Sequence, residues 1–283
     1  MNRSIFSELY NKAFRSGNPL FLFIGINIVV FIAINIFSLG EFLSGGQGFG
    51  SKWILKHLSV PAFYGELPYK FWTLLTYMFV QKDFFHILFN MLWLYWMGQI
   101  FMDFLNKKQF IFTYLSGGIS GALLYLLAYN LIPVFVSNAS NSILLGSSAS
   151  VMAIVVATAT LVPDYTIRLM LFGNVKLKYL ALAYFFLDII SMSGANPGGS
   201  IAHIGGAIMG FVFIKQLQNG NDLSRLFEKK SKLKVVKNTN TKDAKNDFTD
   251  QAAIDSILDK ISKSGYESLS KAEKEQLFKA SKK

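Results

Sequence analysis

The residues with the clearest potential for chemistry are a serine and a histidine, each near the start of an apolar segment. Ser148 lies in the run Gly-Ser-Ser-Ala at residues 146–149, and His203 lies in the run Ala-His-Ile-Gly-Gly at residues 202–206. For a serine to attack an amide, a nearby base must take its proton. We therefore interpret Ser148 as a candidate nucleophile and His203 as a candidate general base.

Two further polar residues, His86 and Asn90, open another apolar segment. Their i,i+4 spacing places them on one face of a helix. Both side chains can donate hydrogen bonds, and the N-terminus of a helix adds unpaired N–H groups and the positive end of its dipole. Donors of this kind suit the negative oxygen that develops when an amide is attacked.

The composition indicates a membrane protein. Of the 283 residues, 52% are hydrophobic and 15% are aromatic, which is more apolar than an ordinary globular domain. The 28 Lys and Arg residues exceed the 17 Asp and Glu residues, but they cluster in the tail and between apolar segments. This distribution favours a role in membrane orientation over nucleic-acid binding. Since the chain has no cysteine, it has no thiolate metal site, and we expect no metal and no cofactor.

Six apolar segments could carry these residues across a bilayer, each near the ~20 residues that a spanning helix needs. They run over residues 20–39, 84–105, 109–129, 146–162, 177–190 and 201–217. The sequence therefore predicts an all-α membrane protein, with a six-transmembrane-helix bundle over residues 20–217 and a small cytoplasmic helical C-terminal tail. Residues 40–50 are predicted to form a Gly-rich loop.

Charge predicts the orientation of this bundle. Basic residues in the N-terminal segment 1–19, in two connections and in the tail place both termini in the cytoplasm, whereas residues 130–145 and 191–200 carry no charge and should face outside. The second, fourth and sixth spans then run in the same direction. Their polar N-terminal residues should lie at one depth, on the outer side. We expect a multi-pass protein of the bacterial inner membrane.

Small residues should let the fourth and sixth spans approach closely. Gly206 and Gly210 form a smooth stripe after His203 on the sixth span. On the fourth span, a small-residue row consists of Ala149, Ala153 and Ala157. Gly146 is grouped with these packing glycines.

The chain beyond the last span is predicted to have a different character. Residues 218–248 resemble a flexible basic linker, and residues 249–283 a small helical hairpin. Asp250 is placed as the cap of its first helix, Gly265 as its end, and Ser270 with Glu273 as a capping box for its second helix. The basic tail is expected to be a solvated segment near anionic lipid, and the sequence does not identify a protein partner for it.

Three motifs together resemble the signature of the rhomboid intramembrane serine proteases. They are residues 146–149, residues 202–206 with Gly210, and His-Ile-Leu-Phe-Asn at residues 86–90. The resemblance implies a dyad of Ser148 and His203 without an acidic third member. It also implies an oxyanion hole made by the Ser148 backbone N–H, His86 and Asn90.

The expected function is that of an intramembrane serine endopeptidase. Its partners would be transmembrane protein substrates, cut in or near the outer end of their spans, and membrane lipid. The alternative is a catalytically weak or inactive rhomboid-like protein that binds transmembrane helices. Departures from the family pattern at Ala149, Met152 and Thr73 bear on this choice.

Two other residues are assigned minor roles. Asp188, near the outer end of the fifth span, could be a third catalytic member, but a solvated or structural role is favoured. His57 is interpreted as a loop residue.

Overall fold

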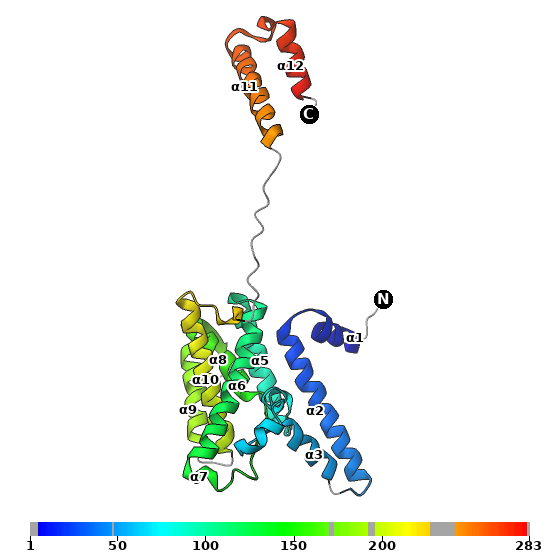
Figure 1. The fold of residues 1–283 in the computed structure, drawn as a ribbon, viewed down its shortest axis with the longest axis vertical. Coiled ribbons are helices and arrows are strands. Elements are labelled where there is room, and N and C mark those ends of the chain that lie inside the picture. Colours follow the sequence, from blue (N-terminus) through cyan, green and yellow to red (C-terminus); the bar gives the residue numbers. More distant parts are fainter. Residues whose placement is uncertain (1–4, 47, 170–172, 192–195, 227–240, 282–283) are drawn as a thin grey trace. The chain divides into compact units, whose positions relative to one another are not determined.

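The computed structural model describes residues 5–46, 48–169, 173–191, 196–226 and 241–281. Contacts divide the chain into two compact units, residues 1–228 and residues 229–283. The first unit is a helical bundle and the second is a helical hairpin (Figure 1).

Ten α-helices are described in the first unit. They are α1 (Ile5–Tyr10), α2 (Pro19–Leu43), α3 (Phe49–Leu58), α4 (Thr73–Thr76), α5 (Phe84–Phe104), α6 (Lys107–Leu131), α7 (Pro133–Val136), α8 (Ser148–Leu161), α9 (Leu177–Ser191) and α10 (Pro197–Gln218). Shorter helical turns lie at Asn11–Arg15 (η1), Tyr64–Tyr69 (η2), Tyr77–Phe79 (η3) and Leu223–Arg225 (η4).

Each predicted span coincides with a helix, but the lengths differ from the expectation. Among the described residues, four helices are long and apolar enough to cross a membrane: α2, α5, α6 and α10. The other two, α8 with 14 residues and α9 with 15, are shorter than the ~20 residues of a full span. Most of α8 is buried within the bundle. A helix enclosed by protein does not have to match the bilayer thickness, because neighbouring segments can satisfy the backbone beyond its ends.

The expectation of an all-α protein was wrong in detail, because the described ranges contain two small antiparallel sheets. In the first, β1 (Val60–Pro61) pairs with β2 (Ile143–Leu144); in the second, β3 (Thr166–Leu169) pairs with β4 (Gly173–Lys176). The β1–β2 pair joins the long loop after α3 to the segment before α8. Strands this short have too little periodicity to be recognised from sequence.

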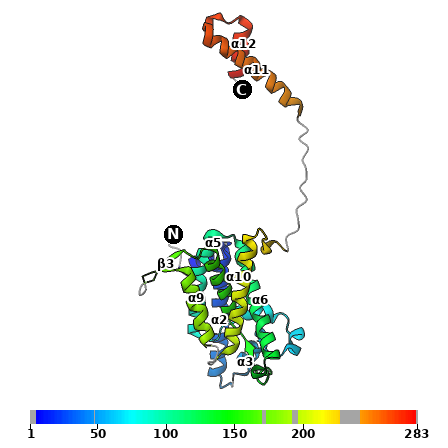
Figure 2. The ribbon, with the colours of Figure 1, turned by 90° about the vertical axis from the view of Figure 1, so that its left-hand side faces the viewer.

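The helix α8 lies at the centre of the first unit, in contact with α5, α6, α9 and α10 (Figures 1 and 2). Small residues make this packing close. A Cβ added to Gly206 would clash with the carbonyl oxygen of Ala149, and one added to Gly210 would clash with that of Ala153. Because both pairs advance by four residues, α8 and α10 run in the same direction.

The helix α6 packs against α8 in the opposite direction. Added Cβ atoms on Gly117 and Gly121 would meet Ala153 and Ala149, respectively. The three helices are therefore held together by backbone contacts that larger side chains would prevent.

The outer surface of the bundle is rich in exposed apolar side chains. They include Ile28, Ile32 and Ile36 on α2, Phe85 and Phe89 on α5, Leu182, Phe186 and Ile190 on α9, and Ile208 and Phe211 on α10. A soluble monomer rarely exposes so many large apolar side chains on its surface. This surface is suited to lipid.

The predicted Gly-rich loop at residues 40–50 is shorter than expected, since α2 continues to Leu43 and α3 begins at Phe49. The Glu41 carboxylate accepts hydrogen bonds from the backbone N–H groups of Gly50 (2.7 Å) and Ser51 (2.8 Å). An acidic side chain that binds the first amides of the next helix stabilises this junction. His57 was wrongly placed in a loop: it lies in α3, and its Nδ1 is 2.8 Å from the Trp53 carbonyl oxygen.

The second unit consists of α11 (Thr241–Ser264), a turn at Tyr266–Ser268 (η5) and α12 (Lys271–Ser281). Its first helix starts earlier than predicted, so Asp250 lies inside α11 and does not cap it. Residues 241–248 of the predicted linker are helical, and residues 227–240 lie outside the described residues. The early part of α11 lacks the apolar periodicity on which the prediction depended.

Two predictions for the hairpin are confirmed: the end of α11 at Gly265 and the capping box of α12. Gly265 follows α11 with a φ of +78°, which favours glycine. Ser270 N donates to Glu273 Oε2 (2.7 Å) and Glu273 N donates to Ser270 Oγ (3.4 Å), so the predicted capping box is present.

Candidate functional site

Ser148 is the first residue of α8 and is 7% exposed. The chain reaches it through a turn at Gly146, whose φ is +117° and whose N–H donates to the Tyr77 carbonyl (3.0 Å). A Cβ added to Gly146 would lie 3.0 Å from His86 Cε1 and 3.7 Å from Ser148 Oγ. Gly146 therefore leaves room for the imidazole of His86 beside Ser148. It precedes α8 and does not pack two helices together, contrary to the sequence interpretation.

His203 lies on α10 at the level of Ser148. Gly121 on α6 marks this level, because a Cβ added there would be 2.7 Å from Ala149 Cβ and 2.7 Å from the Ala202 carbonyl oxygen. These two alanines are the chain neighbours of Ser148 and His203. The fold thus brings together the two motifs that are far apart in sequence.

An acidic side chain accompanies the histidine, which corrects the expectation of a site without one. His203 Nδ1 is 2.7 Å from Asp188 Oδ1, and the side chains are only 14% and 9% exposed. Ser200 Oγ also donates to Asp188, with 3.1 Å to its carbonyl oxygen and 3.3 Å to Oδ1. This acid comes from α9, where the sequence had offered Asp188 as a possible third catalytic member but had favoured a solvated or structural role.

A buried polar network supports the other side of the site. Gln81 Nε2 donates to Ser147 Oγ (2.7 Å) and to Asn27 Oδ1 (3.1 Å), and Gln81 Oε1 accepts from Asn90 Nδ2 (3.3 Å). Gln81, Asn27 and Ser147 are fully buried, and Asn90 is 4% exposed. The network fixes Asn90 relative to the turn that leads to Ser148. Asn90 and Ser147 belong to the motifs seen in the sequence, whereas no motif pointed to Gln81 or Asn27.

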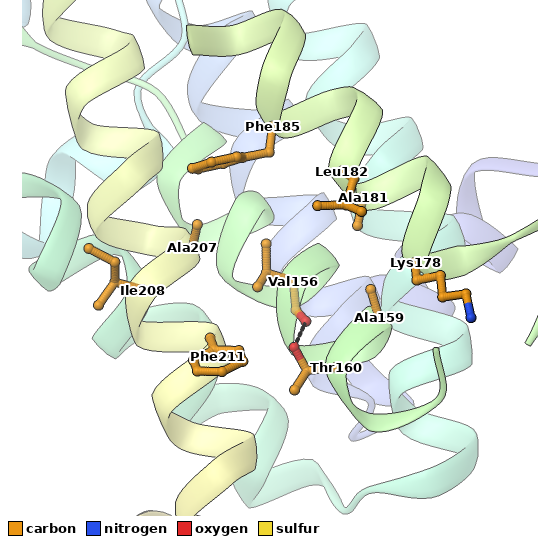
Figure 3. Close-up of a pocket in the computed structure, with 10 residues that line it drawn as sticks. All are labelled: Val156, Ala159, Thr160, Lys178, Ala181, Leu182, Phe185, Ala207, Ile208 and Phe211. Carbon is orange, nitrogen blue, oxygen red and sulfur yellow. Dashed lines mark hydrogen bonds between the residues drawn. The ribbon is translucent and has the colours of Figure 1, made fainter. Parts of the chain in front are cut away.

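The helix α9 makes different contacts on its two sides. On one side, the rings of Trp93 on α5 and Tyr184 on α9 stack with centroids 4.9 Å apart and planes 5° apart. On the other side, α9 and α10 flank an apolar groove of about 440 Å³ (Figure 3). The groove passes Phe185 and Ala207, which lie about one helical turn from Asp188 and His203, and extends to Lys178. Only Leu177 and Ala181 of the described α9 side chains are buried, so this helix packs into the bundle much less than α8 does.

Two ion pairs attach the first end of α9 to Asp164, a residue of the connection between α8 and α9. Asp164 Oδ1 lies 2.9 Å from both Lys178 Nζ and Lys176 Nζ. Hydrogen bonds from Lys178 and Lys176 lower the pKa of Asp164 to about 2. All three side chains are substantially exposed, so solvent weakens the pairs. This end of α9 is therefore attached independently of the site.

Comparisons with known proteins identify the family of this chain. A family model described as the Rhomboid domain matches residues 68–218, and a family of unknown function (DUF6576) matches residues 244–283. The chain is 28% identical over 158 residues to "RHOMBOID-like protein 12, mitochondrial" of Arabidopsis thaliana. The aligned region covers 52% of this chain and 47% of that protein. The chain thus spans about half the length of this curated relative. Because the rhomboid match includes more than half of the 283 residues, the chain belongs to the rhomboid family.

Proposed function

We propose that this protein is an intramembrane serine endopeptidase that hydrolyses peptide bonds in or near the outer end of transmembrane segments. The observation that carries the proposal is that Ala149 and Ala202, the chain neighbours of Ser148 and His203, lie against the same point of α6, at Gly121, on the parallel helices α8 and α10. An ionisable residue inside a membrane bundle is costly and is usually retained for function. Membership of the rhomboid family supports the same assignment.

In the proposed reaction, Ser148 Oγ attacks the substrate carbonyl carbon while His203 takes the hydroxyl proton. The backbone N–H of Ser148 and the side chains of His86 and Asn90 stabilise the negative oxygen of the tetrahedral intermediate. The protonated His203 then gives its proton to the leaving nitrogen, and an acyl-enzyme forms. Water, activated by the same histidine, hydrolyses this ester and restores Ser148.

The test of the nucleophile and base uses Ser148→Ala, His203→Ala and the double variant with a model single-span substrate in proteoliposomes. We expect each variant to abolish cleavage, and the double variant to lose no more than the single ones, because both residues serve one proton transfer. Wild-type protein should also react with a fluorophosphonate probe, whereas Ser148→Ala should not. Full cleavage by either folded single variant would refute the proposal, and substrate binding without cleavage by the wild type would favour a non-catalytic binding protein.

The proposed oxyanion donors should contribute less. We expect His86→Ala and Asn90→Ala each to lower turnover by about 10- to 1,000-fold, since the other donors persist. Unchanged turnover in both variants would show that other groups stabilise the oxygen. Thermal unfolding of each variant controls for loss of structure, because Asn90 also bonds to Gln81.

Substrate access is proposed to involve α9. A substrate helix hides its carbonyl groups in its own hydrogen bonds, so it must unwind before Ser148 can attack. We expect cleavage after a small residue near the outer end of the substrate span, and faster cleavage when Gly or Pro follows downstream. Replacing those residues with Leu and mapping the product by mass spectrometry tests both parts. An unchanged rate, or a cut at the cytoplasmic end, would contradict this mechanism.

The orientation and the membrane are also proposals. We propose a bacterial inner-membrane protein with both termini in the cytoplasm and the N-terminal ends of α8 and α10 on the outer side. Because the chain has no cysteine, Ser137→Cys and Val235→Cys can be probed singly with an impermeant thiol reagent in intact cells. We expect labelling at position 137 only, and labelling at position 235 only would invert the proposed orientation.

A further inference from the structure

We infer that Asp188 is a positioning residue for His203, so that the site contains a serine, a histidine and an aspartate whose acid comes from the neighbouring helix α9. This inference rests on the proposed function, and it differs from the two-residue site implied by the family resemblance. It is carried by the 2.7 Å contact between His203 Nδ1 and Asp188 Oδ1.

The burial of this contact gives it strength. The two side chains are 14% and 9% exposed, so water competes little for either group. The Ser200 hydroxyl, one turn before His203 on α10, lies within reach of two acceptors of Asp188, its carbonyl oxygen at 3.1 Å and the same carboxylate oxygen at 3.3 Å. Asp188 is therefore held from two successive turns of the helix that carries the histidine, and its direction toward His203 is fixed.

The contact selects the form of the imidazole that the reaction needs. A carboxylate only accepts hydrogen bonds, so the proton of neutral His203 is held on Nδ1 and the lone pair is left on Nε2. The Nε2 atom can then take the Ser148 proton. When it does so, the negative carboxylate stabilises the positive imidazolium, as it does in soluble serine proteases.

The contact between His203 and Asp188 depends on the position of α9, the helix that carries Asp188. Half of the described side chains of α9 are exposed, and a groove separates part of the helix from α10 (Figure 3). Displacement of α9 would take Asp188 away from His203. The base is thus fully oriented only when α9 lies against α10, which couples the position of this helix to the chemistry.

Three substitutions separate positioning of the histidine from simple attachment of α9. Asp188→Asn preserves the shape of the side chain, but its amide can meet Nδ1 as donor or acceptor and carries no charge, so it no longer selects one tautomer. Asp188→Glu restores the charge on a longer side chain. The matched control is Asp164→Asn, which weakens the ion pairs with Lys176 and Lys178 at the other end of α9.

The experiment measures cleavage of a model single-span substrate and the rate of fluorophosphonate labelling by the full chain in detergent, with thermal unfolding as the folding control. In soluble serine proteases the corresponding Asp-to-Asn change lowers kcat about 10⁴-fold, and we expect a loss of about 100- to 10,000-fold here, with KM changed less than about threefold. Labelling should fall in parallel, because the small probe does not need the substrate path. Asp188→Glu should recover about tenfold over Asp188→Asn, and Asp164→Asn should label like the wild type.

The result that overturns the inference is labelling of folded Asp188→Asn within about threefold of the wild type. If Asp188→Asn does not fold, Asp188→Glu decides. Labelling of folded Asp188→Glu within about threefold of the wild type overturns the inference. A larger loss, expected to be about 10- to 1,000-fold, supports it, because a displaced carboxylate orients the base poorly. These failures leave the proposed function intact as long as Ser148→Ala abolishes labelling. If the wild type does not label at all, the proposed function fails and this inference fails with it.

Discussion

The close packing around Gly121 makes one substitution a sensitive test of the site. Gly121→Ala places a methyl group 2.7 Å from Ala149 Cβ and 2.7 Å from the Ala202 carbonyl oxygen. Ordinary van der Waals contact begins at 3.4 Å, so each neighbour falls short by 0.7 Å. The new methyl group would push apart the helices that carry Ser148 and His203.

The helix α6 cannot easily move away to relieve this pressure. One turn earlier, Gly117 already packs against Ala153, and an added Cβ on Gly118 would meet Met78 Cε at 2.5 Å and Ser150 Oγ at 2.6 Å. A shift of about 0.7 Å between catalytic groups should lower turnover about 10- to 100-fold, because misplacement by 1 Å can cost about 100-fold. Overpacking of this kind also destabilises a core by about 1–3 kcal/mol.

The matched control is Gly40→Ala, on the exposed part of α2. An added Cβ there would meet no atom of the described residues within 4 Å. Both variants gain the same helix propensity, about 0.5–1 kcal/mol, so the difference between them isolates the effect of the clash. The assay compares turnover of a model single-span substrate in proteoliposomes and the midpoint of thermal unfolding. If Gly121→Ala matches Gly40→Ala in both, the close contact of the three helices is not what holds the site together.

Three further outcomes follow from other contacts. Trp93→Ala removes the stacking contact between α5 and α9, which is worth about 0.5–1.5 kcal/mol. If this contact restrains the movement of α9 that admits substrate, cleavage should be about 2- to 10-fold faster than in Trp96→Ala. Equal rates would exclude this contact as a restraint on access. Gln81→Leu removes three buried side-chain hydrogen bonds, each worth about 0.6–1.7 kcal/mol in a membrane protein, and should lower the unfolding midpoint and turnover together; an unchanged midpoint would contradict this. In the hairpin, hydrogen bonds from the backbone N–H of residue 270 and from the ammonium group of residue 260 lower the pKa of Glu273 from 4.5 to about 2. Since the folded-state pKa is the lower one, this stabilisation is complete above pH 4.5 and is lost as the pH falls toward 2; circular dichroism of a peptide of residues 241–283 should show this loss, and Glu273→Gln should reduce it.

The sequence was sufficient for features that depend on local pattern. Long apolar runs predicted the helices, because a membrane span needs about 20 apolar residues in succession. The Ser148, His203 and His86 motifs were visible because polar residues are rare within such runs. Local chemistry likewise predicted the capping box at Ser270 and the end of α11 at Gly265, and both are present.

Only the tertiary structure decided which polar groups meet. Asp188, on α9, is 15 residues before His203 in the chain, and Gln81 lies 66 residues before Ser147, so neither contact leaves a periodic signal in the sequence. The short strands β1 and β2, and the short span of α8, likewise depend on the protein that surrounds them. Hydrogen bonds in a membrane interior must be satisfied by whatever the fold brings near. The sequence therefore specified the polar groups, and the packing of small residues such as Gly206 and Gly121 determined how closely their helices approach and hence which groups became partners.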